Sequence, residues 1–171
     1  MYEQQSEKGK LIVADDAPVI RTIIKSSVPD FDVIEASNGD EANQKLAENP
    51  DVDGMFLDLM MPGSDGFTVL NNVKDNNIFV PITVISGDDS AATVQKVFDE
   101  YKDIAYIDYV NKPINREKAH EKAARMQQVT HNHRMQNQVN NNPQPTYQQP
   151  SNVVYFNDYQ QQEEQSYQRV A

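Results

Sequence analysis

The sequence predicts an α/β fold, a doubly wound sheet of five parallel strands with helices on both of its faces. Five short runs rich in β-branched residues alternate with helix-sized segments of about ten to fifteen residues, as βαβ units do. Runs such as LIVA and ITVI are apolar throughout, which is typical of strands that helices cover on both sides. We expect the strand order 2-1-3-4-5, which makes the first and third strands neighbours.

The five strands are expected at residues 10–14 (KLIVA), 31–36 (FDVIEA), 54–58 (GMFLD), 81–86 (PITVIS) and 107–110 (IDYV). The fourth helical segment shows an apolar stripe at positions i, i+3, i+4 and i+7, which predicts core packing by Val94, Val97, Phe98 and Tyr101. The fifth helix, residues 115–128, offers only Ala119, Ala123 and Met126 for packing. We therefore expect this last helix to be weakly held.

Composition divides the chain into three parts. The 171 residues suit one ordinary domain with an appendage. We expect a flexible N-terminus at 1–9, a folded domain at 10–128 and a disordered Gln/Asn-rich tail at 129–171. From Thr130 to Ala171 there is no leucine, isoleucine, glycine or lysine, so the tail cannot bury enough apolar surface to offset its ordering entropy. Removing everything after Gln128 should then leave the domain intact.

Charge and residue usage exclude several classes of protein. The formal net charge of -11 opposes sequence-independent binding to nucleic acid or to anionic membranes, so no direct DNA binding is expected. Cysteine is absent, which excludes disulfides, thiolate zinc sites and cysteine nucleophiles and fits a reducing compartment. No apolar run approaches the length of a membrane span. We expect a cytoplasmic protein without membrane insertion.

Polar side chains follow four of the five predicted strands. Asp15 and Asp16 come after the first strand and Asp58 ends the third. Because ligands of a doubly wound sheet bind outside the carboxyl ends of its strands, these three carboxylates are expected to converge. Carboxylates that lie so near one another raise each other's pKa unless a cation balances their negative charges. Hard oxygen ligands favour Mg²⁺, with Mn²⁺ possible, over zinc.

The fourth and fifth strands add groups that suit a phosphoryl group. Lys112 supplies a compact positive charge, the Ser86 hydroxyl donates a hydrogen bond, and Gly87 leaves the approach open. Phosphoryl transfer needs mainly positioning and charge neutralisation around an in-line nucleophile. Asp58 is the carboxylate placed to be that nucleophile.

Each of these residues also has a simpler interpretation. An Asp pair after a strand often caps a helix, and Pro18 suits a first helical turn. Lys112 could be an ordinary surface lysine, and His120 is expected to be solvated. His131 and His133 could bind a metal weakly, but disorder is favoured there. The combination of groups at four strand ends favours the metal and phosphoryl site.

Four motifs together resemble a response-regulator receiver domain across residues 10–127. These are ADD (14–16), LDLMMPGSDG (57–66), VISG (84–87) and YVNKP (109–113). The resemblance implies a CheY-like, flavodoxin-like fold and a stand-alone two-component response regulator.

The resemblance also implies roles for single residues. Asp58 is the phosphoacceptor, Asp16 a direct metal ligand, Asp15 a ligand often acting through water, and Met60 a ligand through its backbone carbonyl. The phosphoryl-binding group is Ser86, Gly87 and Lys112, the switch is Ser86 with Tyr109, and Pro113 follows a cis peptide bond.

The implied function is to receive a phosphoryl group from a histidine kinase or phosphotransfer protein and to bind an unknown protein target. Such a protein is a monomer or a weak phosphorylation-dependent dimer. It is not an enzyme beyond self-phosphorylation and self-dephosphorylation. The alternative is a constitutive scaffold or interaction module that acts through its low-complexity tail.

Overall fold

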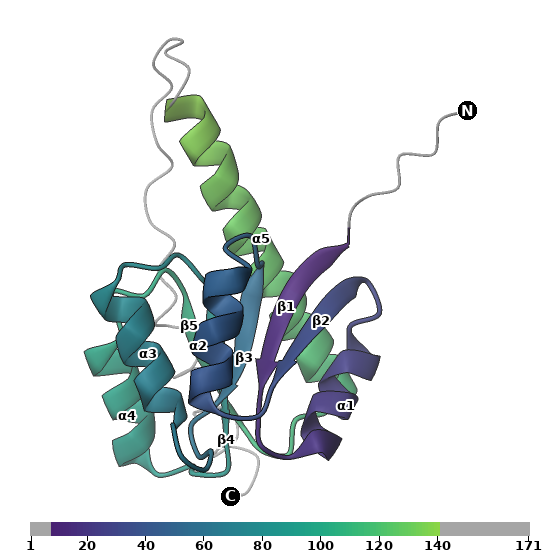
Figure 1. Ribbon diagram of the computed structural model, residues 1–171, viewed down its shortest axis with the longest axis vertical. Coiled ribbons are helices and arrows are strands. Elements are labelled where there is room, and N and C mark those ends of the chain that lie inside the picture. Colours follow the sequence, from purple (N-terminus) through teal and green to yellow (C-terminus); the bar gives the residue numbers. More distant parts are fainter. Residues whose placement is uncertain (1–7, 141–171) are drawn as a thin grey trace, which may run out of the picture. The chain divides into compact units, whose positions relative to one another are not determined.

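The protein folds as one parallel sheet with helices on both faces. The computed structural model describes the backbone of residues 8–140 and the side chains of residues 8–138 (Figure 1). The strands are β1 (Gly9–Ala14), β2 (Phe31–Ala36), β3 (Gly54–Asp58), β4 (Ile82–Ser86) and β5 (Ile107–Asn111). The helices are α1 (Pro18–Ser27), α2 (Gly39–Glu48), α3 (Gly66–Asp75), α4 (Ala91–Glu100) and α5 (Arg116–Asn140). All strand pairs are parallel, and the order β2-β1-β3-β4-β5 confirms the predicted topology.

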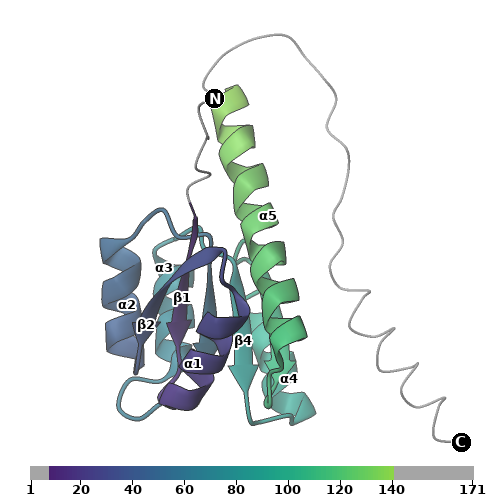
Figure 2. The same cartoon turned by 90° about the vertical axis from the view of Figure 1, so that its right-hand side faces the viewer.

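The alternation of side chains along each strand builds two separate cores. Ile12, Met55 and Leu57 point to the face that also buries residues of α2, α3 and α4. Leu11 and Phe56, their neighbours in sequence, point to the opposite face, which also buries residues of α1 and α5. Figures 1 and 2 show the helices divided between the two faces in this way. Burial on both faces explains why the central strands are apolar throughout.

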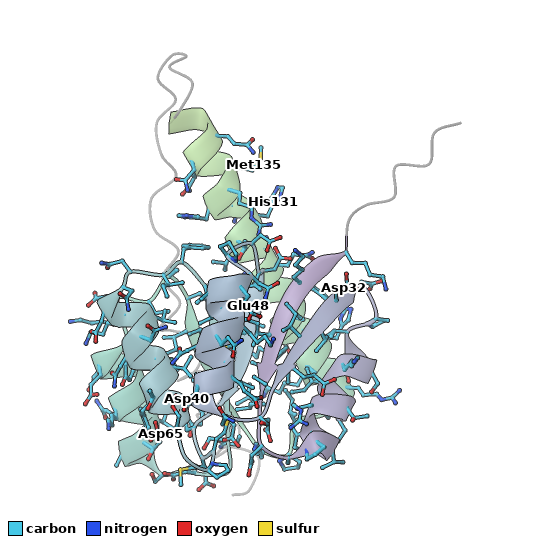
Figure 3. All side chains as sticks on the ribbon, viewed as in Figure 1. Asp32, Asp40, Glu48, Asp65, His131 and Met135 are labelled. Atoms are coloured by element: carbon cyan, nitrogen blue, oxygen red, sulfur yellow. The ribbon has the colours of Figure 1, made fainter. Side chains whose placement is uncertain are left out.

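α5 extends past the predicted end of the domain. The prediction that disorder begins at residue 129 is wrong for residues 129–140, which continue the helix. The predicted start is also displaced slightly, because β1 already begins at Gly9. Figure 3 shows His131 and Met135 on the part of α5 that projects past the ends of the strands. Residues 1–7 and 141–171, to which the remaining predictions of flexibility apply, lie outside the described residues.

Side-chain contacts hold this extension to the segments that precede β3 and β4. The Thr130 side chain is buried, and its hydroxyl donates to the backbone carbonyl of Asp53 at 2.8 Å. The Arg134 guanidinium contacts the Asp53 carboxylate at 2.9 Å and donates to the carbonyl of Asp51 at 2.6 Å. The His133 ring stacks on Phe79 with ring centroids 3.5 Å apart. Polar and aromatic side chains, together with the partly buried Val129, therefore attach the helix here.

The earlier turns of α5 pack closely in spite of their small side chains. Ala119, Ala123 and Met126 are fully buried, as the sequence predicts. A Cβ atom at Gly54 would lie 2.7 Å from the Cβ and Sδ atoms of Met126, so the glycine in β3 lets the helix approach the sheet directly. The Thr83 hydroxyl also contacts Met126 Sδ at 3.5 Å. α5 is therefore better anchored than its composition indicates.

The contacts of Thr130 and Arg134 lead to a prediction that differs from the one made from sequence. We expect truncation after Gln128 to lower the free energy of unfolding by about 2 kcal/mol, because it leaves buried groups of Asp53 without their partners. Truncation after Asn140 should leave this free energy unchanged. Urea unfolding of the two shortened chains measures the difference, and equal midpoints would contradict it. Arg134→Ala should reproduce part of the loss, whereas Gln136→Ala, at an exposed position of the same helix, should not.

No helix among residues 8–140 is both long enough and apolar enough to cross a membrane.

Candidate functional site

The carboxyl ends of β1 and β3 bring the three predicted carboxylates together. In the register of these strands Ala14 lies beside Leu57, so the next residues, Asp15 and Asp58, fall side by side. One carboxylate oxygen each from Asp15, Asp16 and Asp58 lies within 4.8 Å of the others. Asp15 and Asp58 are buried, and Asp16 is exposed. The convergence expected from strand order is thus present.

Lys112, which follows β5, lies between the two buried carboxylates. Its Nζ atom is 2.6 Å from Asp58 Oδ2 and 2.8 Å from Asp15 Oδ2. Burial acts to lower the pKa of Lys112, but the contacts with Asp15 and Asp58 outweigh it and raise this pKa. The Lys112–Pro113 peptide bond is cis. Lys112 is therefore a charged member of the site and not an ordinary surface lysine.

Asp58 is held by the loop that follows it. The backbone N–H of Met60 donates to Asp58 Oδ1 at 3.0 Å, while Met60 as a whole residue is 67% exposed. Burial raises the pKa of the Asp58 carboxyl, and the hydrogen bonds from Lys112 and Met60 oppose that rise. Oδ1 and Oδ2 of Asp58 thus each have one hydrogen-bond donor.

Gly66, which sequence reasoning did not single out, lets this loop close. A Cβ atom at Gly66 would lie 2.2 Å from the backbone oxygen of Asp58, a distance that no side chain tolerates. The N–H of Gly66 donates to the carbonyl of Leu59 at 3.1 Å. The N-terminus of α3 therefore packs directly on the end of β3. The only sequence signal was the glycine that ends LDLMMPGSDG.

The interpretation of the Asp pair as a helix cap is wrong. The N-cap residue of α1 is Ala17, which has no side-chain cap, and Pro18 occupies the first turn. Asp15 Oδ1 accepts a hydrogen bond from the N–H of Ala17 at 2.9 Å. In the part of the chain that the structure describes, no hydrogen bond or ion pair involves the Asp16 carboxylate. Asp16 thus offers free oxygen atoms at the edge of the site.

Ser86 ends β4 and Gly87 follows it, while Tyr109 lies within the neighbouring strand β5, opposite Val84. Ser86 is buried, and its Oγ accepts a hydrogen bond from the N–H of Asp88 at 3.2 Å. The Tyr109 side chain is also buried, and its hydroxyl donates to the carbonyl of Asp88. Burial raises the pKa of Tyr109. A Cβ atom at Gly87 would meet nothing within 4 Å, so this glycine borders open space.

The histidines do not join this site. His133 stacks on Phe79 and contacts the side chain of Asn137, so the prediction of disorder at His133 is wrong. Within residues 8–138, Asp15, Asp16 and Asp58 form the one group of three or more acidic, histidine or cysteine side chains placed to hold a metal ion. His120 and His131 are both exposed.

The donor set fits a hard divalent cation. All three candidate ligands are carboxylates, which suit Mg²⁺ or Mn²⁺ and not zinc. Asp15 and Asp58 share a single positive partner, Lys112, and Asp16 has none of its own. Three carboxylates against one ammonium leave a negative charge for a cation to neutralise.

Comparison with known proteins places this arrangement in a family. A model of the response regulator receiver domain matches residues 11–124. The chain is 36% identical to response regulator RR06 of Streptococcus pneumoniae over 107 residues, which cover 61% of this chain and 46% of RR06. It is 32% identical to protein PilG of Pseudomonas aeruginosa over 122 residues, which cover 67% of this chain and 84% of PilG. The chain thus spans less than half of RR06 and most of PilG.

A solved structure agrees with these matches. The receiver domain of the Francisella response regulator 1452 superimposes with a TM-score of 0.63 at 26% identity, covering 72% of this chain and 99% of that domain. The strand order, the acidic cluster and the lysine before a cis proline fit the same assignment. The chain belongs to the response regulator receiver domain family.

Proposed function

We propose that this protein is a response regulator whose Asp58 accepts a phosphoryl group in a Mg²⁺-dependent reaction and whose phosphorylated form binds a protein target. The observation that carries the proposal is the environment of Asp58. It is a buried carboxylate at a strand end, held by Lys112 and the Met60 N–H beside two further carboxylates. Such rigid placement is what phosphoryl transfer requires.

Asp15, Asp16 and Asp58 would hold Mg²⁺, with the Met60 carbonyl as a further ligand. When bound, the ion would neutralise charge on the carboxylates and on the incoming phosphoryl oxygens. Lys112 remains the fixed positive group, since both of its contacts are carboxylate oxygens of the site. The Ser86 hydroxyl would donate a hydrogen bond to the incoming group, and Gly87 would leave space beside it.

The chemical step forms one bond and breaks one. An Asp58 oxygen attacks phosphorus, and the bond from phosphorus to the donor breaks as the acyl phosphate forms. With a phosphohistidine donor the imidazole nitrogen keeps the electron pair and takes up a proton. The donor is a histidine kinase or a phosphotransfer protein. Because we expect such a donor to act in the cytoplasm, we assign the reaction to that compartment. Loss of the phosphoryl group to water is the only other reaction we assign.

The switch joins Ser86 to Tyr109 through one residue. Asp88 donates its N–H to Ser86 Oγ and accepts a hydrogen bond from the Tyr109 hydroxyl on its carbonyl. A shift of Ser86 toward the phosphoryl group would therefore pull on the backbone that holds Tyr109. The face formed by α4, β5 and α5 would change with it and present the phosphorylated state to a target.

The Mg²⁺ site can be tested separately from phosphorylation. We expect Mg²⁺ at about 100 times its Kd to raise the free energy of unfolding by about 2.7 kcal/mol through binding linkage. Asp16→Ala should abolish this gain, because it removes a ligand without disturbing a hydrogen bond. Thermal unfolding with Mg²⁺ and with EDTA measures both. A melting temperature of the wild type that does not change when Mg²⁺ is added would count against the metal site.

The output is tested by capture of partners on three forms of the protein. Wild type, Asp58→Ala and wild type loaded with beryllofluoride and Mg²⁺ are compared under identical conditions. A partner retained by the loaded form and not by Asp58→Ala supports phosphorylation-dependent binding. Equal retention by all three forms would favour the constitutive scaffold, whose proposed tail lies largely in residues 141–171, outside the described residues.

A further inference from the structure

The guanidinium of Arg21 contacts the backbone of the acidic pair, Asp15 and Asp16. Arg21 is in the first turns of α1, and its Nη1 atom donates to the carbonyl of Asp15 at 2.7 Å and to that of Asp16 at 3.4 Å. Its Nε atom donates to Glu35 Oε2 on β2 at 3.0 Å. One side chain thus connects the turn between β1 and α1 to the neighbouring strand.

The turn needs such a connection because its two carboxylates must point to the same side. The N–H of Asp15 donates to the carbonyl of Ala36 at 3.1 Å, and the Asp15 carboxylate accepts from Ala17. Asp16 has no such support for its carboxylate among the described residues. Because each peptide unit is planar, holding the two carbonyl oxygens on Arg21 fixes the backbone from which both carboxylates project.

Glu35 in turn holds Arg21. Glu35 lies opposite Val13 in the register of β1 and β2, near the end of both strands. Its other oxygen contacts Lys25 Nζ at 3.0 Å. Hydrogen bonds from Lys25 and then from Arg21 lower the pKa of Glu35, so it stays anionic at neutral pH. The Arg21 side chain is 15% exposed, and the Lys25 side chain is more exposed than that. The ion pair of Arg21 with Glu35 is therefore better shielded from solvent than the ion pair of Lys25 with Glu35.

We propose that Arg21 is a positioning residue of the metal site, which acts through the backbone carbonyls of Asp15 and Asp16 and never touches the ion. This inference rests on the proposed Mg²⁺-dependent function. The guanidinium suits the task because its planar, forked donors reach a carbonyl and a carboxylate at once. The ammonium of a lysine is a single point charge and cannot bridge both.

The positive charge of Arg21 and its positioning of the ligands should have opposite effects on the affinity for a metal ion. This difference in sign makes the proposal testable. Removing a cation near three carboxylates would, by charge alone, strengthen the binding of a divalent ion. Removing a group that fixes the ligands would weaken it. Groups that hydrogen-bond to the metal-ligating residues without touching the ion typically affect metal affinity by about 10- to 100-fold. We expect Arg21→Met to weaken binding at the low end of that range.

The experiment measures Mn²⁺ binding by electron paramagnetic resonance in the full chain, with no phosphodonor present. Arg21→Met is expected to raise the Kd for Mn²⁺ about tenfold. Arg21→Lys should weaken binding as well, although it keeps the charge. Lys25→Met is the matched control, because it removes the other cation on Glu35 and leaves the Asp15 and Asp16 carbonyls untouched. Its Kd should stay within about twofold of wild type.

Phosphorylation supplies a second readout. At low Mg²⁺, labelling of Arg21→Met by acetyl phosphate should be slow, and saturating Mg²⁺ should restore the rate to near that of wild type. A general loss of folding would not be repaired in this way, and Arg21→Lys carries the test if Arg21→Met does not fold. Wild-type or tighter Mn²⁺ binding in both Arg21 variants would overturn the inference about Arg21 but not the proposed function. Absence of Mn²⁺ binding in the wild type would overturn the proposed function as well.

Discussion

Replacing Asp58 by asparagine should abolish phosphorylation by acetyl phosphate or a kinase. Wild type should gain one acid-labile acyl phosphate in the presence of Mg²⁺, and Asp58→Asn none. Asparagine has nearly the same shape, but its amide lacks the anionic oxygen that attacks phosphorus. The variant should fold, because the substitution removes one of two buried carboxylates that share Lys112. Intact-protein mass spectrometry with hydroxylamine treatment measures the label.

Asp65→Asn is the matched control for this experiment. Asp65 lies in the same loop, is the N-cap of α3 and accepts hydrogen bonds from Thr68 at 2.9 and 3.0 Å. Asparagine caps a helix about as well as aspartate, so this variant should be labelled like the wild type. Undiminished labelling of Asp58→Asn would show that another residue accepts the phosphoryl group.

Replacing Lys112 by methionine should lower the free energy of unfolding by about 3 kcal/mol in buffer with EDTA, because buried carboxylates lose their positive partner. Asp15 and Asp58 are almost fully buried and each lies within 2.8 Å of Lys112 Nζ. Mg²⁺ should restore much of the loss, since it supplies the missing positive charge to the same oxygen atoms. The stabilisation by Mg²⁺ should therefore be larger in Lys112→Met than in the wild type.

Urea unfolding in EDTA and in Mg²⁺ measures both effects. Lys102→Met removes the same charge from an exposed position, and its stability should match that of the wild type in both buffers. Unchanged stability of Lys112→Met in EDTA would mean that the two carboxylates are not charged together in the folded protein. A loss that Mg²⁺ fails to repair would mean that the ion and Lys112 do not share the same oxygens.

The site was predictable because its residues sit at fixed places in a regular fold. Buried parallel strands are recognisable as short apolar runs, and their carboxyl ends meet at one edge once the strand order is known. Asp15, Asp58 and Lys112 follow directly from that rule. Their motifs are also specific enough to indicate the family before any geometry is known.

What the sequence could not predict depends on partners far apart in the chain. The partner of Thr130 and Arg134 is Asp53, which is 77 and 81 residues away, so the composition of residues 129–138 alone indicated a tail. The role of Gly66 requires knowing that α3 packs on the backbone of Asp58. The role proposed for Arg21 requires knowing where β2 places Glu35. In each case a tertiary contact outweighs the local pattern.

The position of Asp53 has a practical consequence for attaching other molecules to this protein. Asp53 accepts from the N–H of Lys10 near the start of β1 and pairs with Arg134 near the end of the described part of α5. Residue 8, before β1, and residue 138, near the end of α5, therefore both lie toward the edge of the sheet opposite the one that carries Asp58. Residues 116–138 of α5 alone span about 33 Å at 1.5 Å per residue. A fluorescent reporter or a surface tether joined at residue 8 or 138 would leave the edge that carries Asp58 open to the proposed phosphoryl donor.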